Sequence, residues 1–150
     1  MDRSELPLTA FIDPTGGNHR EVEALAQQVL TRVLARLSQA RDRAPLPTPI
    51  EVADLANIPD APVDESQLLD QLDRILATSM NAAHPRYIGH MDSMPTVISM
   101  LGDLIASAVN NNMLSVEMSP IFSRLEPLLL KQFAALFGLG ESAGGVLLSG

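Results

Sequence analysis

The sequence predicts a mainly α-helical chain in which one short strand comes at the end. Two long segments, residues 19–39 and 64–79, repeat apolar side chains at the spacing of an amphipathic helix. A mostly apolar segment at residues 96–109 suits a buried helix. The apolar run at residues 146–148 is the one segment with the pattern of a buried strand.

The first helix is expected at residues 19–39. The breaker sequence DPTGG precedes it, and Asn18 with Glu21 has the spacing of a capping box. The apolar stripe of this helix consists of Val22, Leu25, Val29, Leu30, Val33, Leu34 and Leu37. Three prolines within residues 41–49 remove amide donors and favour extended backbone, so this segment is expected to be a linker.

A weak helical turn is expected at residues 50–56, before the breaker sequence NIPDAPVD. The second strong helix is expected from Asp64 to Ser79, with Asp64 as its cap. Residues 81–95 are expected to be irregular, because they contain two prolines and several small or polar residues. The third helix, at residues 96–109, is expected to end at the three asparagines that follow it.

Residues 113–120 have an extended pattern. A fourth helix is expected from Ser119 to Phe137, with Gly138 just beyond its end. Pro127 lies inside this span and lacks the amide that a helix interior needs, so it either kinks the helix or splits it.

The composition is that of a folded protein whose partners are small molecules or other protein surfaces. Apolar residues make up 46% of the 150 residues, which is enough for a hydrophobic core. A net charge of -8 argues against general binding to nucleic acid or to an anionic membrane. The N-terminus lacks a secretory signal and no apolar run approaches the roughly 20 residues of a membrane span, so we expect a cytoplasmic protein.

Few residues form a pattern with recognised chemistry. The sequence has no cysteine, no Gly-x-Ser-x-Gly elbow, no P-loop and no histidine pair at metal-ligand spacing, so no metal site is predicted. The densest polar stretch lies between residues 84 and 93, and on its residues alone it favours satisfied turns over a binding site. Glu117 and Arg124 are expected either on a solvated face or in a structural ion pair.

Three blocks of sequence, HPRYIGHMDS, DLIASAVNNNMLSVEMSPIFSRLE and GGVLLSG, follow one another along the chain. Their order and spacing resemble the N-terminal part of the group II pyridoxal-phosphate-dependent decarboxylases, the family of glutamate, aromatic amino acid, histidine and diaminobutyrate decarboxylases. The resemblance is closest over residues 84–150. It implies the N-terminal part of a fold-type I, aspartate-aminotransferase-like α/β fold.

By this resemblance, residues 1–80 form a helical segment that is swapped between the subunits of a homodimer. Residues 81–150 form the start of the large domain that binds pyridoxal 5′-phosphate, and the chain stops at the phosphate-binding turn. Ser149 and Gly150 are expected to lie at the edge of that turn, where amides at a helix N-terminus hold a phosphate.

The resemblance also implies substrate-facing residues. His90, Asp92 and Ser93 stand where the family has a polar side chain that meets a small amino acid substrate. Asp92 puts an acidic substrate in doubt and favours a cationic one such as a diamino acid, unless it only caps the turn that follows. Asn112 and Leu114 match positions that reach the active site of the neighbouring subunit.

The implied activity is the decarboxylation of an amino acid with pyridoxal phosphate as cofactor. The cofactor-binding lysine of this family comes well after the phosphate turn, whereas Lys131, the only lysine here, precedes that turn. No catalytic residue is therefore expected in the chain, which is expected to be inactive by itself. Two alternatives stay open: a non-catalytic helical dimerisation module left by truncation, and a related fold-type I pyridoxal lyase or synthase.

Overall fold

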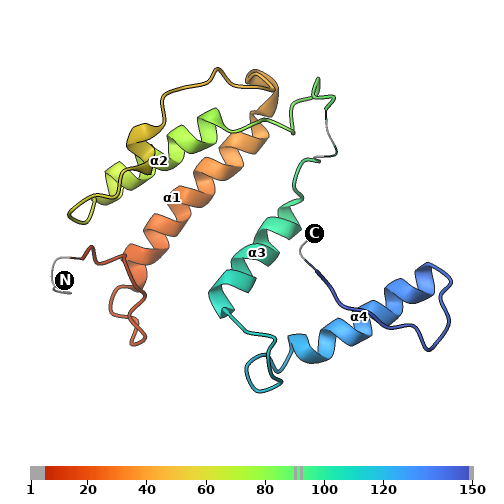
Figure 1. Cartoon of the computed structure of the whole chain (residues 1–150). Helices are drawn as coiled ribbons and strands as arrows, with labels where there is room; N and C mark the ends of the chain where they lie inside the picture. The colour runs from red at the N-terminus through yellow and green to blue at the C-terminus, as the bar shows by residue number, and fades with distance from the viewer. Residues whose placement is uncertain (1–5, 90, 92, 149–150) are drawn as a thin grey trace. The chain divides into compact units, whose positions relative to one another are not determined.

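A computed structural model describes residues 6–89, 91 and 93–148. These residues form four α-helices and two short 3-10 helices, with no strand among them, which confirms the mainly α-helical prediction. In chain order the elements are α1 (His19–Ser38), η2 (Ala40–Asp42), η3 (Ala53–Ala56), α2 (Glu65–Thr78), α3 (Val97–Val109) and α4 (Phe122–Leu136) (Figure 1).

The chain divides into two compact units, Met1–Met94 and Pro95–Gly150. The first unit contains α1, η2, η3 and α2, and the second contains α3 and α4. The functional boundary predicted between residues 80 and 81 stays a prediction, because it concerns subunit exchange and cofactor binding.

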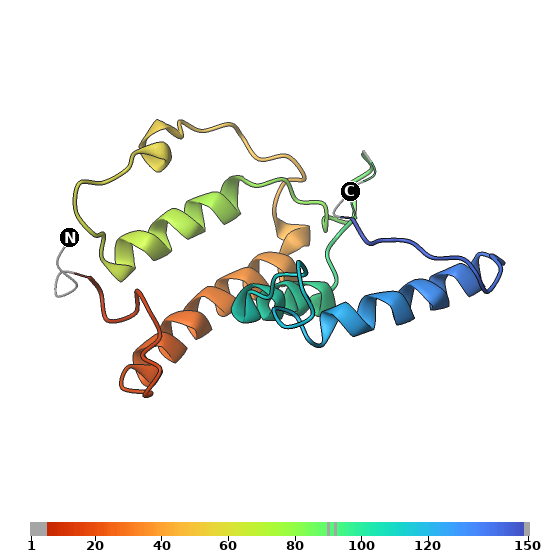
Figure 2. The ribbon, with the colours of Figure 1, turned by 60° about the horizontal axis from the view of Figure 1, so that its bottom comes forward.

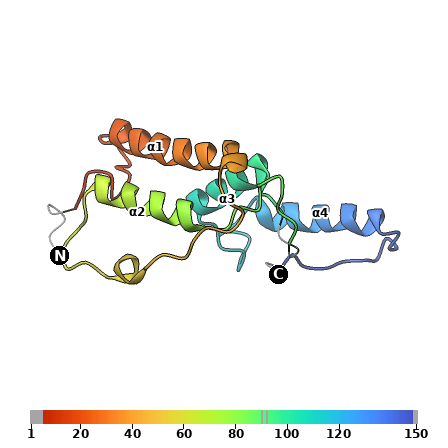
Figure 3. The same ribbon diagram turned by 90° about the horizontal axis from the view of Figure 1, so that it is seen from above.

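In the first unit, α1 and α2 lie side by side and run in the same direction (Figures 1 and 3). Arg32 Nε lies 3.1 Å from Asp73 Oδ2, and further along both helices Arg36 Nη2 donates to the carbonyl of Ser79 at 2.7 Å. A parallel pair needs a return segment, and residues 43–64 run back along α2 to supply it (Figure 2). The weak turn at η3 and most of the predicted linker lie in this return segment, whereas residues 41 and 42 of that linker belong to η2.

Charged side chains offset the cost of placing two helix dipoles side by side. Glu21 lies in the first turn of α1, Glu65 in the first turn of α2, and Arg36 in the last turn of α1. Negative charge at a helix N-terminus and positive charge at a C-terminus are both favourable. Burial, together with the nearby charge of Arg43, lowers the pKa of Arg36.

The predicted cap of α2 is confirmed, whereas the predicted capping box of α1 is wrong. Asp64 Oδ1 accepts from the amide of Gln67 at 2.8 Å, and the amide of Asp64 donates to Gln67 Oε1 at 3.3 Å. The side chain of Asn18 makes no cap hydrogen bond, because its Oδ1 instead accepts from the amide of Asp13 at 2.8 Å, while its Nδ2 donates to the carbonyls of Leu8 and Phe11 at 2.6 and 2.7 Å. Asn18 thus fastens the preceding segment to the start of α1.

The second unit contains the predicted third helix, but not the burial predicted for it. Helix α3 ends at Asn110, which adopts the left-handed conformation at φ 43°, as expected of a terminating asparagine. No residue of α3 is buried, and Ile98 is 76% exposed. The described part of this unit offers only α4 and irregular segments to cover a helix that is apolar on most sides. No helix of the described residues is both long and apolar enough to cross a membrane.

Two local predictions around α4 are also corrected. Residues 113–118 form turns instead of an extended segment, because the amides of Met118 and Ser119 both donate to the carbonyl of Ser115 at 3.2 Å. Helix α4 starts at Phe122, later than predicted, and continues through Pro127 without being split.

The predicted strand at residues 146–148 is absent from the structure. A strand needs a neighbour to accept and donate its ladder hydrogen bonds, and the described residues contain no other strand. The amide of Leu147 instead donates to Glu126 Oε1 on α4, at 2.8 Å.

Candidate functional site

The polar loop predicted to face the substrate begins at a buried asparagine. Asn81, which is 5% exposed, donates through Nδ2 to the carbonyl of Ala40 at 2.8 Å and to that of Arg43 at 3.4 Å. Its backbone amide donates to the carbonyl of Pro45 at 2.9 Å. The start of the loop is therefore tied to η2, which follows α1, and to the linker after it.

The next residues fold into consecutive turns. The amide of His84 donates to the carbonyl of Asn81 at 3.1 Å, and the amide of Tyr87 donates to the carbonyl of His84 at 2.8 Å. The amide of Arg86 donates to His84 Nδ1 at 3.0 Å. His84 and Arg86 are thus turn residues in this structure, as the interpretation from the residues alone favoured.

The predicted substrate-binding residues are described only in part. His90 and Asp92 lie outside the described residues, and Ser93 is exposed. Thr96 caps α3, where its Oγ1 accepts from the amide of Ser99 at 3.1 Å. The roles predicted for His90, Asp92 and Ser93 stay predictions.

The structure brings together the two residues predicted to reach a neighbouring subunit. Asn112 Oδ1 accepts from the amide of Leu114 at 2.8 Å in the turn that follows α3. Leu114 is 83% exposed, and the side chain of Asn112 is exposed as well. Both side chains therefore lie on the surface of the second unit. Ser149 and Gly150, predicted at the phosphate turn, lie outside the described residues.

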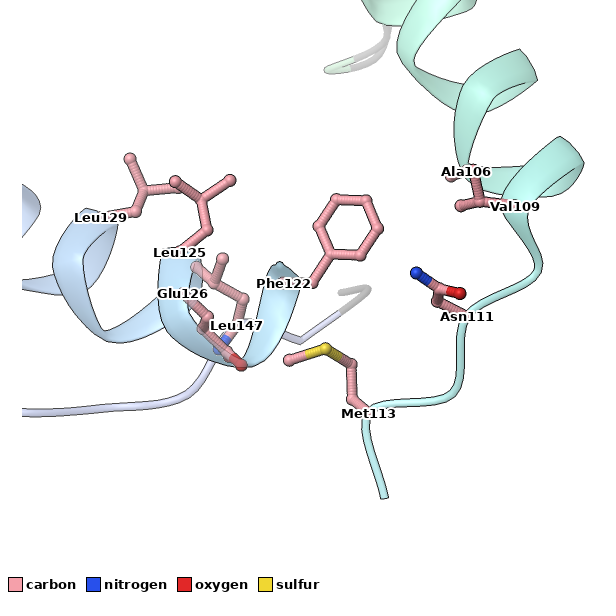
Figure 4. A pocket seen from close by; sticks show the side chains of 9 residues that line it. All are labelled: Ala106, Val109, Asn111, Met113, Phe122, Leu125, Glu126, Leu129 and Leu147. Carbon is pink, nitrogen blue, oxygen red and sulfur yellow. The ribbon is translucent and has the colours of Figure 1, made fainter. Parts of the chain in front are cut away.

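An apolar pocket of about 400 Å³, which sequence reasoning did not predict, lies within the second unit. Asn111 and Met113 extend toward α4 from the segment after α3, and Leu147 of the C-terminal segment lines the pocket beside Leu125 and Glu126 (Figure 4). The remaining lining residues are Ala106, Val109, Phe122, Leu125, Glu126 and Leu129. The apolar residues of α4 recur at helical spacing in the sequence, and this pattern could have predicted the apolar helix face that lines the pocket.

The carboxyl group of Glu117, in the turn before α4, interacts among the described residues only with groups of the same turn. The backbone amide of Glu117 and the hydroxyl of Ser115 hold the pKa of the Glu117 carboxyl below its ordinary value. Glu117 and Arg124 are both exposed, and the described residues contain no ion pair between them. Of the two predictions for this pair, the solvated face is the one that the structure supports.

A family model for the pyridoxal-dependent decarboxylase conserved domain matches residues 47–150. The chain belongs to this family. The resemblance predicted from the three sequence blocks is therefore confirmed.

Two solved structures have a similar fold. The crystal structure of mouse CSAD matches with a TM-score of 0.77 and 23% identity, covering 92% of this chain and 29% of that chain. Mouse CSAD in apo form matches with a TM-score of 0.67 and 22% identity, covering 84% of this chain and 27% of that chain. The pyridoxal-dependent family and these matches confirm the prediction of an N-terminal part of the fold-type I class. The chain spans less than a third of the length of these chains.

The apolar pocket of the second unit does not fit the phosphate-bearing cofactor of this family. A phosphate needs amide donors or cationic side chains, whereas the polar side chains in the apolar pocket are the amide of Asn111 and the carboxylate of Glu126. Lys131 is exposed on α4 and does not line this pocket. We therefore derive no catalytic step from the described residues.

Proposed function

We propose that residues 1–150 are the N-terminal portion of an enzyme that removes the α-carboxylate of a small amino acid with pyridoxal 5′-phosphate as cofactor. The observation that carries the proposal is the family match over residues 47–150. In such an enzyme the pyridoxal ring takes up the electron pair that remains when carbon dioxide leaves. The chain by itself is expected to be inactive.

Within this proposal, residues 1–80 pack on the second subunit of a homodimer in the cytoplasm. Exposed apolar side chains on both helices of this segment support packing on a second subunit, because folded soluble proteins rarely leave such helix faces uncovered. Residues 81–150 begin the cofactor-binding domain, to which Ser149 and Gly150 contribute the edge of the phosphate turn.

The substrate would meet His90, Asp92 and Ser93 from one subunit, with Asn112 and Leu114 contributed by the other. The exposure of Ser93 and of Leu114 is compatible with these roles, because both side chains are free to meet another surface. Asp92 favours a cationic amino acid, because a carboxylate attracts an ammonium group and repels a second carboxylate.

The proposal is tested on the complete gene. The DNA downstream of codon 150 is sequenced, the full reading frame is expressed with pyridoxal phosphate, and carbon dioxide release is measured on a panel of cationic, acidic and neutral amino acids. We expect release from at least one amino acid. A downstream frame that continues into a Gly/Ser-rich turn and later a His-Lys pair would agree with this, whereas an unrelated downstream gene would contradict it.

One observation favours a second candidate, a non-catalytic helical dimerisation module. Helices α1 and α2 leave apolar side chains such as Leu34 and Ile75 exposed, and a second copy of the chain could cover them. A related pyridoxal lyase or synthase would keep the fold and change the product. Measuring amine and aldehyde alongside carbon dioxide separates these possibilities, because a module yields no product, a decarboxylase yields an amine and an aldehyde-forming synthase yields an aldehyde.

A further inference from the structure

We propose that residues 7–12 form an ordered docking element for a second copy of this chain, and that they bind at the opposite end of the second copy's helix pair. The inference rests on the proposed function, because it takes the second copy to be the other subunit of the homodimer. It adds which surface of the first unit makes the contact and where on the other copy that contact falls.

The docking element belongs to the loop before α1, in which apolar side chains face water while polar groups hold the backbone. Leu8, Phe11 and Ile12 are between 69% and 73% exposed. Asn18 Oδ1 accepts from the amide of Asp13, and Asn18 Nδ2 donates to the carbonyls of Leu8 and Phe11. One asparagine therefore fixes the backbone of a loop that exposes three large apolar side chains.

A second tether joins the docking element to α2. Thr9 Oγ1 donates to Glu65 Oε1, in the first turn of α2, at 2.6 Å, and the amide of Ala10 donates to the carbonyl of Pro7 at 2.9 Å. Ordering a loop costs conformational entropy, and apolar side chains that stay in water return little of that cost. A surface that is already ordered binds more tightly, and an exposed aromatic side chain such as Phe11 is a typical anchor of an interface.

Charge is separated along the helix pair, because α1 and α2 run in the same direction and both begin near the docking element (Figures 1 and 3). Acidic side chains predominate at this acidic end, where Arg20 is also present: Asp13, Glu21, Glu23, Asp64 and Glu65. Basic side chains predominate at the other, basic end, where Asp42 is also present: Arg36, Arg41, Arg43 and Arg86. Among the described residues, none of these four arginines forms an ion pair with a carboxylate.

This separation of charge favours a second copy as the partner. In a twofold dimer, any contact that one copy makes to the other is repeated in the reverse direction. Two acidic ends repel each other, whereas an acidic end is attracted to a basic end, and the symmetry supplies that contact twice. The basic end also exposes Leu46 and Met80, which lie next to the bonded pair Pro45 and Asn81 and offer an apolar surface to the docking element. An apolar centre with a charged rim is the usual composition of an interface.

The absence of cysteine allows this contact to be tested by cross-linking. Ala10→Cys and Ala44→Cys, at exposed positions of the docking element and the basic end, are introduced into separate copies of residues 1–150, one with a size tag. With a short bismaleimide, the mixed dimer should form about fivefold faster than the dimer of Ala10→Cys with itself. Ser142→Cys, at an exposed position of the second unit, is the matched control for Ala44→Cys. Equal rates for all three combinations would overturn the inference.

The contribution of the aromatic anchor is measured by sedimentation equilibrium. Phe11→Ala should raise the dissociation constant of the dimer about tenfold, because it removes the central apolar side chain of the docking element. Phe137→Ala is the matched control, since Phe137 is 79% exposed in the second unit, and it should change the constant less than about twofold. Equal constants for the two variants, or a chain that stays monomeric, would overturn the inference.

Charge reversal tests which ends meet. Glu21→Lys with Glu23→Lys reverses the acidic end, and Arg41→Glu with Arg43→Glu reverses the basic end. Each double variant alone should dissociate about tenfold more readily, and an equimolar mixture of the two should recover the original dimer strength, because opposite charges then meet at both contacts. A mixture that does not recover would overturn the inference. Carbon dioxide release from the full-length parent tests the proposed function separately, so an active parent without the cross-link overturns this inference alone.

Discussion

Asp64 closes the start of α2 with both halves of a capping box, and its ionisation is coupled to that structure. The amide of Gln67 and the hydroxyl of Ser66 hold the pKa of Asp64 below its ordinary value of 3.8. A carboxyl group with a depressed pKa in the folded state stabilises that state above its unfolded pKa. The contribution is lost as the pH falls through the folded pKa.

We therefore expect the Tm of the first unit to fall on acidification below about pH 4, and Asp64→Asn to weaken this dependence. Asparagine caps a helix about as well as aspartate but does not titrate in this range, so the neutral-pH Tm should change little. Thermal unfolding followed by circular dichroism between pH 2.5 and 7 provides the measurement. Asp60→Asn, at an exposed position in the preceding loop, should leave the acid dependence unaltered, and an equal effect of both variants would contradict the assignment.

A second prediction at this scale concerns substrate choice in the full-length enzyme. If Asp92 contacts the substrate side chain, Asp92→Asn should lower kcat/KM for a cationic amino acid such as 2,4-diaminobutyrate by about tenfold or more, and leave uncharged amino acids nearly unaffected. If Asp92 only caps a turn, all substrates should suffer alike and stability should fall by about 1 kcal/mol. Steady-state kinetics on both substrate classes separates the two outcomes.

Among the helices, the two units differ in how much tertiary structure supports them. Helix α2 packs on α1 and buries Leu69, whereas α3 has no buried residue. Helix α3 also contains Gly102, at which an added Cβ would meet no atom within 4 Å. A helix with so little cover depends mainly on the intrinsic preferences of its residues.

Gly102→Ala is therefore expected to stabilise α3 by about 0.5–1 kcal/mol in the chain of residues 1–150, because alanine loses less backbone entropy in a helix. Backbone chemical shifts of residues 97–109 report the gain in helix population. Gly138→Ala is the matched control, since Gly138 has φ 68° just after α4 and a side chain there is strained. Gly138→Ala is expected to destabilise the end of α4, which is the opposite sign to the effect of Gly102→Ala on α3. A loss of helix population at residues 97–109 in Gly102→Ala would refute the argument.

Local chemistry allowed the helices to be predicted, and tertiary partners account for the errors. Residues 19–39 and 64–79 and the cap at Asp64 were predictable because periodicity and capping act within a few residues. The role of Asn18 was missed because its partners, Leu8 and Phe11, follow no local rule.

The burial of α3 and the strand at residues 146–148 were predicted wrongly for a related reason. An apolar pattern indicates that a segment is suited to burial, but it does not supply the surface that covers it. At the candidate site, the motif blocks were sufficient for the family. The anchoring role of Asn81 required the pairing with Ala40, about 40 residues away.

At the scale of the whole molecule, apolar surface is the dominant feature. Leu34 on α1 and Ile75 on α2 are 41% and 48% exposed, and Leu104 on α3 is 62% exposed. Soluble monomers rarely leave contiguous apolar patches of more than a few hundred Å² open to water. These exposed apolar side chains therefore support the proposal that the helices pack on a second subunit.

The chain of residues 1–150 is accordingly expected to self-associate, with a mass at or above that of a dimer in light scattering. Leu34→Glu should reduce the mass by placing a charge on the exposed apolar face of α1. Ile58→Glu, at an exposed loop position, should have no such effect. A stable monomer at micromolar concentration would count against the proposal that the N-terminal helices pack on a second subunit.

The parallel arrangement of α1 and α2 has a consequence for biosynthesis. Asn81 and its partner Ala40 are 41 residues apart, so the end of α1 is translated well before the residue that anchors it. At the usual rate of about 5–20 residues per second, the interval is roughly 2–8 s. An antiparallel hairpin with a short turn could pair as soon as its second helix emerged. During this interval the apolar stripe of α1 has no partner helix, and the nascent chain offers chaperones a binding site that the finished helix pair covers only in part.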